Sequence, residues 1–186
     1  MSNLTDFFPL GGGGGLTPKF EEFNASGTFT PSQALIDAGG YIEVFLVGGG
    51  GKGSGSDYGG SGGEAFFKKL YLTNTSSISV NIGAGSTSSG NGGSSSFNAS
   101  SAGAVNLTAL GGTGGSSTKQ TNSTLNASWP STNYNYATAG NGIFGYGAGG
   151  QRSNGGGINT PKANSGQGSN SNANAASGYC LIKWYE

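Results

Sequence analysis

Runs of glycine are the feature that most limits what this chain can fold into. Glycine occupies 40 of the 186 positions, and it is concentrated at 11–15, 48–63, 83–93, 111–115 and 140–150. Each ordered glycine costs about 0.5–1 kcal/mol relative to alanine because more backbone entropy is lost. Hydrophobic residues make up only 33% of the chain, so the core has to be thin. Such a chain gains most when its stability is shared with neighbouring subunits or partner chains.

Short apolar segments between the glycine runs have the composition of β-strands. Residues 41–47 are rich in β-branched and aromatic side chains, and the apolar end of this segment predicts burial on both faces. Apolar and polar residues alternate from Phe23 to Phe29, as in a single strand. The short turn at 74–76 favours antiparallel pairing of the strands on either side of it. The remaining predicted strands cover 64–72, 77–82, 94–99, 105–110 and 179–185.

Helical spacing is absent apart from one possible turn within 31–38. The sequence therefore predicts an all-β fold, an antiparallel β-sandwich of jelly-roll-like type with long Gly/Ser/Asn-rich loops and an extended N-terminal arm. The glycine tracts are interpreted as loops in which glycine supplies positive-φ turns and close backbone approach. The alternative is a packed layer of polyglycine II helices, although the spacing of the glycines is irregular.

The N-terminal segment is predicted to be a docking arm. A compact apolar cluster precedes five glycines, which cannot continue a regular element. We therefore divide the chain into an arm with its pentaglycine linker, 1–19, and a glycine-rich β-sandwich domain, 20–186. The start has neither a basic region nor a long apolar stretch, so no secretory signal and no transmembrane helix are expected. The apolar residues of the arm are Leu4, Phe7, Phe8, Pro9 and Leu10.

The chain lacks the residues on which most catalytic sites depend. It has no histidine and a single cysteine, Cys180, which is expected to be buried, so neither a catalytic triad nor a metal-ligand set is predicted. The net charge is zero, which gives no reason to expect nucleic acid. Two Gly-x-Gly-x-x-Gly strings within 140–150 lack the flanking strand and helix of a dinucleotide site, so no cofactor is expected. The only acidic cluster to test for glycoside hydrolysis is Glu43, Asp57 and Glu64, with a solvated strand face as the favoured interpretation of Glu43.

Aromatic residues inside a polar tract are the candidate receptor-binding site. Aromatic faces stack on sugar rings, and the surrounding amides and hydroxyls can bond to sugar hydroxyls, so a host surface glycan is a possible ligand. Alternatively, these aromatic residues anchor long loops to the sheet or to a subunit interface. The residues are Trp129, Tyr134, Tyr136, Phe144 and Tyr146.

Several motifs occur in the order found in glycine-rich bacteriophage tail-fibre domains. Gly27-Thr-Phe-Thr-Pro31 is followed by the strand 41–47, which runs into a glycine tract, and the chain closes with an apolar strand ending in Trp184. Between them, 62–69, 78–85 and 92–97 also resemble that family. The Ser/Asn/Thr-rich segment 116–139 departs from the pattern. The resemblance implies a virion component, assembled in the host cytoplasm, that is often trimeric and has no catalytic residues.

These features together predict a non-enzymatic phage structural protein. The expected role is a tail-fibre or fibre-tip subunit that contributes to host attachment, forms a homotrimer and contacts other virion proteins through the arm, with no nucleic acid partner and no membrane insertion. A capsid decoration protein is the alternative, and a glycan hydrolase is a third and weaker one.

Overall fold

The computed structural model describes residues 15–54, 60–114, 163–169 and 173–186. These residues form a β-rich molecule in which one short α-helix and one 3-10 helix connect strands. The elements are β1 (Pro18–Phe23), β2 (Gly27–Phe29), α1 (Gln33–Asp37), β3 (Tyr41–Val47), β4 (Ala65–Tyr71), β5 (Ile78–Asn81), β6 (Ser95–Asn98), η2 (Ser100–Ala102), β7 (Leu107–Ala109) and β8 (Tyr179–Tyr185).

The strands form two antiparallel four-stranded sheets, as the sequence predicts. Sheet A has the order β1-β8-β3-β4, and sheet B has the order β2-β5-β6-β7. β3 lies inside sheet A, between β8 and β4, and its last four residues are all buried. The predicted burial of this strand on both faces is therefore confirmed. It explains the continuous apolar sequence, because a strand buried on both faces cannot carry polar residues at alternate positions.

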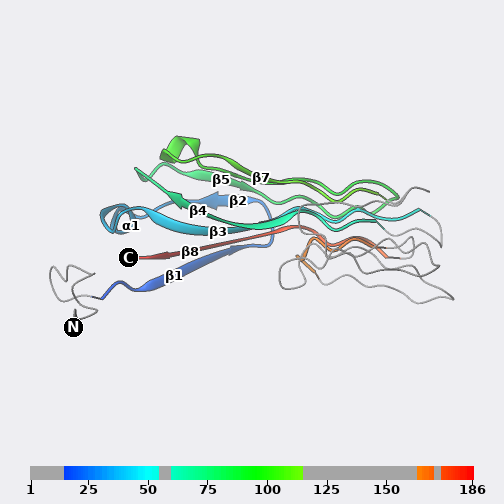
Figure 1. Cartoon of the computed structure of the whole chain (residues 1–186), viewed down its shortest axis with the longest axis horizontal. Helices are drawn as coiled ribbons and strands as arrows, with labels where there is room; N and C mark the ends of the chain where they lie inside the picture. The colour runs from blue at the N-terminus through cyan, green and yellow to red at the C-terminus, as the bar shows by residue number, and fades with distance from the viewer. Residues whose placement is uncertain (1–14, 55–59, 115–162, 170–172) are drawn as a thin grey trace, which may run out of the picture.

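The main core lies between the two sheets. Alternate residues of β3, namely Ile42, Val44 and Leu46, pack in it with Phe29 and Phe97 of sheet B. Cys180 is fully buried in the same cluster, as predicted. Figure 1 shows the two layers in the half of the molecule that contains α1 and the C-terminus.

Two predictions about strand pairing are wrong. The alternating segment from Phe23 to Phe29 is not one strand, because the chain leaves sheet A after β1 and enters sheet B with β2. The strands flanking the turn at 74–76 do not pair either, since β4 bonds to β3 whereas β5 bonds to β2 and β6. In both places the chain crosses from one layer to the other, which lets each sheet bury one face against its partner.

Beyond the sandwich, the described glycine tracts form a bundle of extended segments. We call the segment 48–53, which continues β3, the central segment. Successive N–H groups of this segment point to different neighbours, and two of the three directions repeat every third residue. Gly48 and Gly51 donate to carbonyls of Glu64 and Ser61, and the next residue in each case, Gly49 or Lys52, donates to the segment 90–93. Three residues per turn, with no hydrogen bond inside the segment, is the geometry of a polyproline II-type helix.

Six described segments surround the central segment in a closed ring. Each contacts the next through backbone hydrogen bonds and also bonds to the central segment, so donors and acceptors are satisfied in every direction. We call the whole assembly the glycine bundle. Going around the ring, its outer segments are 60–64, 110–114, 90–93, 83–86, 174–178 and 165–169.

The described glycine tracts are therefore not the irregular loops that we favoured, and the polyglycine II alternative describes them; the tract 140–150 lies outside the described residues. Of the described glycines, only Gly39, Gly40, Gly103 and Gly166 have positive φ, and three of these lie outside the bundle. Most of the described bundle glycines are needed because a side chain would collide with a neighbouring backbone. A Cβ on Gly49 or Gly50 would lie 2.2 Å or 2.0 Å from a carbonyl oxygen of an adjacent segment.

The bundle extends the sandwich in one direction. The central segment continues β3, 83–86 and 110–114 continue β5 and β7, and three returning segments lead into β4, β6 and β8. At the other end of the molecule, the Thr17 amide donates to the Glu186 carbonyl at 2.7 Å. Figure 1 shows β1 beginning and the C-terminus ending at one end, with the bundle projecting from the opposite end.

Candidate interaction surface at the far end of the glycine bundle

At the end of the bundle farthest from the sandwich, the described chain reverses at 87–89. Lys52, at the outer end of the central segment, is the first residue there whose side chain leaves the packed interior. Its Nζ donates to the carbonyl of Thr87 at 3.0 Å and to Oδ1 of Asn174 at 3.3 Å. One ammonium group thus joins two separate segments of the chain, because its three donors on a flexible stem can bond to more than one acceptor.

Further polar side chains close the same end. Oγ of Ser169, which is fully buried, donates to the carbonyl of Ala173 at 2.7 Å. Oδ1 of Asn91 accepts from the amide of Gly114 at 2.8 Å. Thr87, Ser88, Ser89 and Asn91 are exposed there. The described part of this end therefore presents hydroxyl and amide groups on a hydrogen-bonded backbone support.

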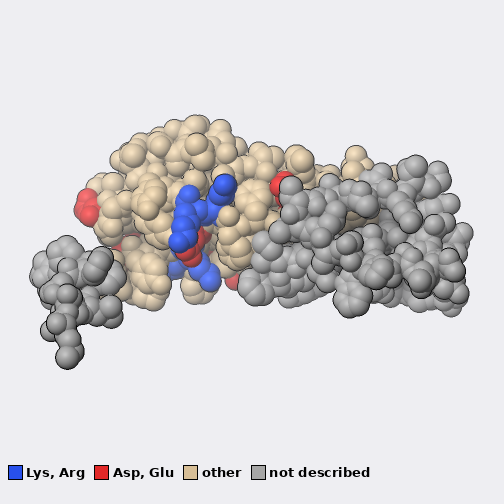
Figure 2. Space-filling model, viewed as in Figure 1, with Lys and Arg blue, Asp and Glu red and all other residues tan. Residues whose placement is uncertain are grey.

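Charge is sparse over the bundle. Among its described residues only Lys52 and Glu64 are ionisable, and Glu64 lies at the sandwich end, where it accepts from the Leu110 amide at 3.0 Å. Figure 2 shows lysine and acidic side chains gathered over the sandwich half on this face. The described part of the far end is therefore suited to hydrogen bonding rather than to long-range attraction of a charged ligand.

All the predicted receptor-binding residues lie outside the described residues. This applies to Trp129, Tyr134, Tyr136, Phe144 and Tyr146, and also to the arm residues Leu4, Phe7, Phe8, Pro9 and Leu10. What the structure fixes is where their segment departs. The segment 115–162 follows Gly114 at the far end and returns at Ala163. Three residues later, Gly166 bonds to Ser177 and Gly63 at the sandwich end of the bundle.

The described members of the predicted acidic cluster have structural partners. Glu43 projects from the outer face of sheet A, where Oε1 accepts from the Tyr41 hydroxyl at 2.9 Å and lies 3.7 Å from Nζ of Lys69. Glu64 is bonded to the backbone of the bundle, as described above, and Asp57 lies outside the described residues. Within the described part of the chain, no group of three or more His, Cys, Asp or Glu side chains could hold a metal ion.

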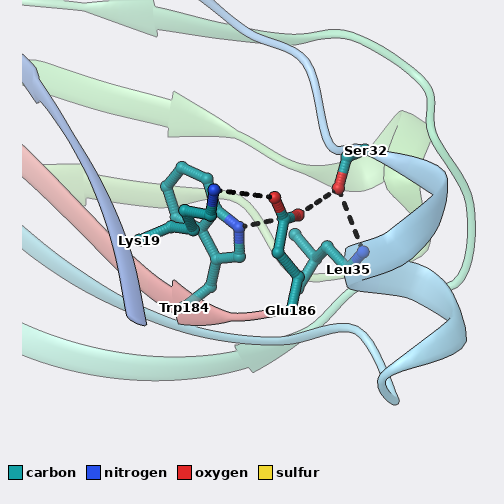
Figure 3. A network of polar contacts seen from close by, with 5 residues as sticks. All are labelled: Lys19, Ser32, Leu35, Trp184 and Glu186. Carbon is teal, nitrogen blue, oxygen red and sulfur yellow. Dashed lines mark hydrogen bonds and ion pairs between the residues drawn. The ribbon is translucent and has the colours of Figure 1, made fainter. Parts of the chain in front are cut away.

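At the opposite end, Glu186 is the centre of a polar network that the sequence analysis did not identify (Figure 3). Its Oε2 accepts from the Ser32 hydroxyl and from Nε1 of Trp184 at 3.2 Å, and its Oε1 lies 3.7 Å from Nζ of Lys19. The Ser32 hydroxyl, Trp184 and Lys19 together hold the pKa of Glu186 below its ordinary value. Ser32 also caps α1, accepting from the Leu35 amide at 3.0 Å, which is the one sequence signal that pointed here.

Cys180 has no accessible chemistry in this fold. Burial, with a smaller contribution from the Glu21 carboxylate, raises the pKa of its thiol to about 12. The thiolate needed for nucleophilic attack or metal binding is therefore not populated at neutral pH. Among the described residues, no helix is long and apolar enough to span a membrane.

A family model described as a glycine-rich domain matches residues 24–185, which is nearly all of the sandwich and bundle. No curated protein and no solved structure matches the chain.

Proposed function

The chain belongs to the glycine-rich domain family, and from this premise we propose that it is a non-enzymatic structural protein of a bacteriophage particle. In this proposal it is a tail-fibre or fibre-tip subunit that is held at the end containing Thr17 and Glu186. The far end of its glycine bundle then faces the host surface.

The observation that supports this role is the separation of the two ends. The N-terminal arm joins the described chain beside the C-terminus, as the hydrogen bond between Thr17 and Glu186 shows. Lys52 and the turn at 87–89 lie at the opposite end of the bundle. A molecule that must bind a particle and a cell at once needs two attachment regions that do not compete for the same space.

The bundle suits the part of a spacer. Its backbone groups are bonded in all directions around the central segment, so it gains stiffness without a large apolar core. A stiff support lets variable segments at its end carry specificity while the scaffold stays fixed. In this proposal the segment 115–162 supplies the receptor contacts, with Trp129, Tyr134, Tyr136, Phe144 and Tyr146 stacking on sugar rings of a surface glycan.

Binding of the purified protein to bacterial cells and to an array of bacterial surface glycans tests the receptor role. We expect binding that is lost when Trp129, Tyr134 and Tyr136 are all changed to alanine, while the thermal unfolding temperature is unchanged. Val105→Ala, at an exposed position outside sheet A, is the control and should leave binding intact. Binding to neither cells nor glycans would reject host attachment and would favour the capsid decoration protein.

Incorporation into particles tests the virion role separately. The variant Phe7→Ala with Phe8→Ala should fold normally, because both positions precede β1 in the sequence, yet it should be missing from purified particles. Immunogold labelling would then place the unmodified protein at the tail tip. Normal incorporation of the double variant would contradict docking through the arm, and labelling over the capsid shell would contradict the tail-fibre assignment.

A further inference from the structure

The outer face of sheet A exposes an unusual number of aromatic side chains. Phe20, Tyr185, Tyr71 and Phe67 are 70%, 53%, 65% and 50% exposed, and they come from the strands β1, β8 and β4. Strand register puts all of them on the face opposite the core. Ile42 and Leu46 of β3 point into the core, and the four aromatic residues are aligned with the alternate positions of β3, which point outward. Exposed aromatic residues gathered on one face are typical of protein interfaces.

A band of charge crosses this face between the aromatic rows. Glu43 of β3 is opposite Lys69 of β4 on one side and Lys183 of β8 on the other, and Lys183 is opposite Phe20 of β1. Glu43 and Lys69 form an ion pair. In Figure 2 the cationic and acidic side chains form a compact band over the sandwich half, with uncharged surface beside it.

We propose that the outer face of sheet A binds the same face of a second copy of this chain, about a two-fold axis that runs parallel to the strands between β8 and β3. Such an axis places β3 over the partner's β8 and β4 over the partner's β1. Glu43 then faces a lysine of the opposite copy, the equivalent of Lys183, and the equivalent contact repeats on the other side of the axis.

A second contact in the same row also fits this operation. Lys69 lies over the residue equivalent to Phe20, a pairing of an ammonium group with an aromatic face. The charged row of this face is therefore complementary to itself, as an isologous interface requires.

The axis also fixes the direction of the two molecules. Rotation about a line parallel to the strands leaves the strand direction unchanged, so both glycine bundles project the same way. Packed sheets keep their strands within about 30° of each other, which retains this alignment. The pair presents two far ends side by side, which would give two linked attachment points on one particle.

The size of the face sets the expected strength. Four strands about 4.8 Å apart and about seven residues long cover roughly 400 Å², against about 800 Å² per partner in a standard stable interface. We therefore expect a weak, concentration-dependent dimer in solution. The homotrimer implied by the family resemblance is a different arrangement, because a head-to-tail ring does not place a face against itself.

Analytical ultracentrifugation of the full chain over a range of concentrations tests the dimer. Lys183→Glu should weaken association about tenfold or more, because it sets two like-charged contacts across the axis. Combining it with Glu43→Lys should restore association. Phe20→Glu should weaken it as well, whereas Val105→Glu is the matched control, because Val105 is 65% exposed but lies outside sheet A.

Crosslinking tests the geometry. In one chain, Phe20 and Lys69 are on the two edge strands, about 14 Å apart at three strand spacings. With cysteines at both positions, a short bismaleimide should link two chains in high yield, whereas either single variant should give little product. The buried Cys180 should not react, because its thiolate is suppressed.

Three results would overturn the proposal. They are a monomer at every concentration, a trimer, or equal crosslinking of the single and double cysteine variants. Thermal unfolding at low concentration, where the chain is monomeric, shows whether each variant is folded, so a lost dimer cannot be confused with a lost fold. None of these outcomes depends on host binding, so this inference and the proposed function can fail separately.

Discussion

At the scale of single residues, the central segment requires glycine because there is no space for a side chain. Its backbone conformation does not by itself require glycine. An added Cβ on Gly48, Gly49, Gly50 or Gly51 would lie within 2.2 Å of a carbonyl oxygen, and the oxygens belong to three different surrounding segments. No single neighbour could move aside to accept all four methyl groups. A run of consecutive glycines is therefore needed wherever one segment is enclosed on every side.

Gly50→Ala should destabilise the fold. The new methyl carbon would lie 2.0 Å from the Gln167 carbonyl oxygen, so the backbone of one segment has to shift, at a cost of about 1–3 kcal/mol. Thermal unfolding followed by circular dichroism measures the loss. Gly90→Ala is the matched control, because its nearest atom would be 3.8 Å away. Equal stability of the two variants would contradict the packing described for the bundle.

Glu186 makes stability depend on pH at the end near the termini. Its folded pKa is lowered from the ordinary value of 4.5, so its charged form is favoured by folding. The sign follows from linkage: the contribution is complete above 4.5 and disappears as the pH falls through the lowered pKa. At neutral pH the charged Glu186 carboxylate therefore stabilises the polar network that joins β8, β1 and the start of α1.

Glu186→Gln should remove this dependence. Above the ordinary glutamate pKa the variant should unfold at a lower temperature than the unmodified chain, because it lacks the charge that faces Lys19. The difference should shrink as the pH falls below that value. Ser89→Ala, at the exposed far end, should show no such trend. A constant difference between Glu186→Gln and the unmodified chain across the acid range would show that the network does not act through its charge.

At the scale of elements, one serine connects the two sheets where the sandwich becomes the bundle. The Ser95 hydroxyl, which is fully buried, donates to the Val47 carbonyl at 2.6 Å and accepts from the Gly83 amide at 2.9 Å. It thereby joins β3 of sheet A to β6 and to the segment that follows β5. The hydroxyl bonds to two backbone groups at the point where β-strands continue into segments of the glycine bundle. These groups would otherwise need other hydrogen-bond partners.

Ser95→Ala should leave that donor and that acceptor buried without a partner. The expected cost is about 1–3 kcal/mol, the usual penalty for an unsatisfied buried polar group. Chemical denaturation of the variant checks the magnitude. The control is Ser89→Ala, at an exposed turn, which should change stability little. A neutral effect of Ser95→Ala would mean that the junction reorganises and that this hydroxyl does not determine how the bundle joins the sandwich.

At the scale of the whole molecule, two kinds of stabilisation are joined end to end. The sandwich is held by apolar burial between two sheets, whereas the bundle is held by backbone hydrogen bonds across a ring of segments. The low hydrophobic content of the chain is therefore compatible with an ordered structure, because the bundle requires few apolar side chains.

Hydrogen exchange should show whether the glycine bundle is rigid or consists of mobile loops attached to the sandwich. Amides of Gly49, Gly50 and Gly51 are bonded to three separate segments and enclosed by the ring, so they should exchange as slowly as the amides of β3. The exposed turn at 87–89 should exchange fast and serves as the internal reference. Mass spectrometry of peptides covering 48–53 measures this, and fast exchange there would contradict a rigid bundle.

Much of the local structure could be predicted from the sequence, because strand patterns are local. The predicted strands 41–47 and 179–185 agree with β3 and β8, and the buried positions of β3 and Cys180 were also predicted correctly. The pairing of β4 and β5 could not be predicted in this way. A short turn fits both a hairpin and a crossing between layers, and only packing of the complete core selects one of them.

The glycine tracts show where the sequence alone reaches its limit. The high glycine content indicated that backbone segments could approach each other closely. The irregular spacing of the glycines, however, did not predict the regular arrangement of the bundle. That order depends on which faces each segment turns toward its neighbours, and only the assembled ring determines those faces. The Glu186 network is decided in the same way, because Ser32 and Glu186 are 154 residues apart and meet only when β8 ends beside α1. The sequence thus determined the class of fold and the lack of a recognisable catalytic set, while the tertiary structure decided which glycines are indispensable and which ends of the chain lie together, because both depend on contacts between distant segments.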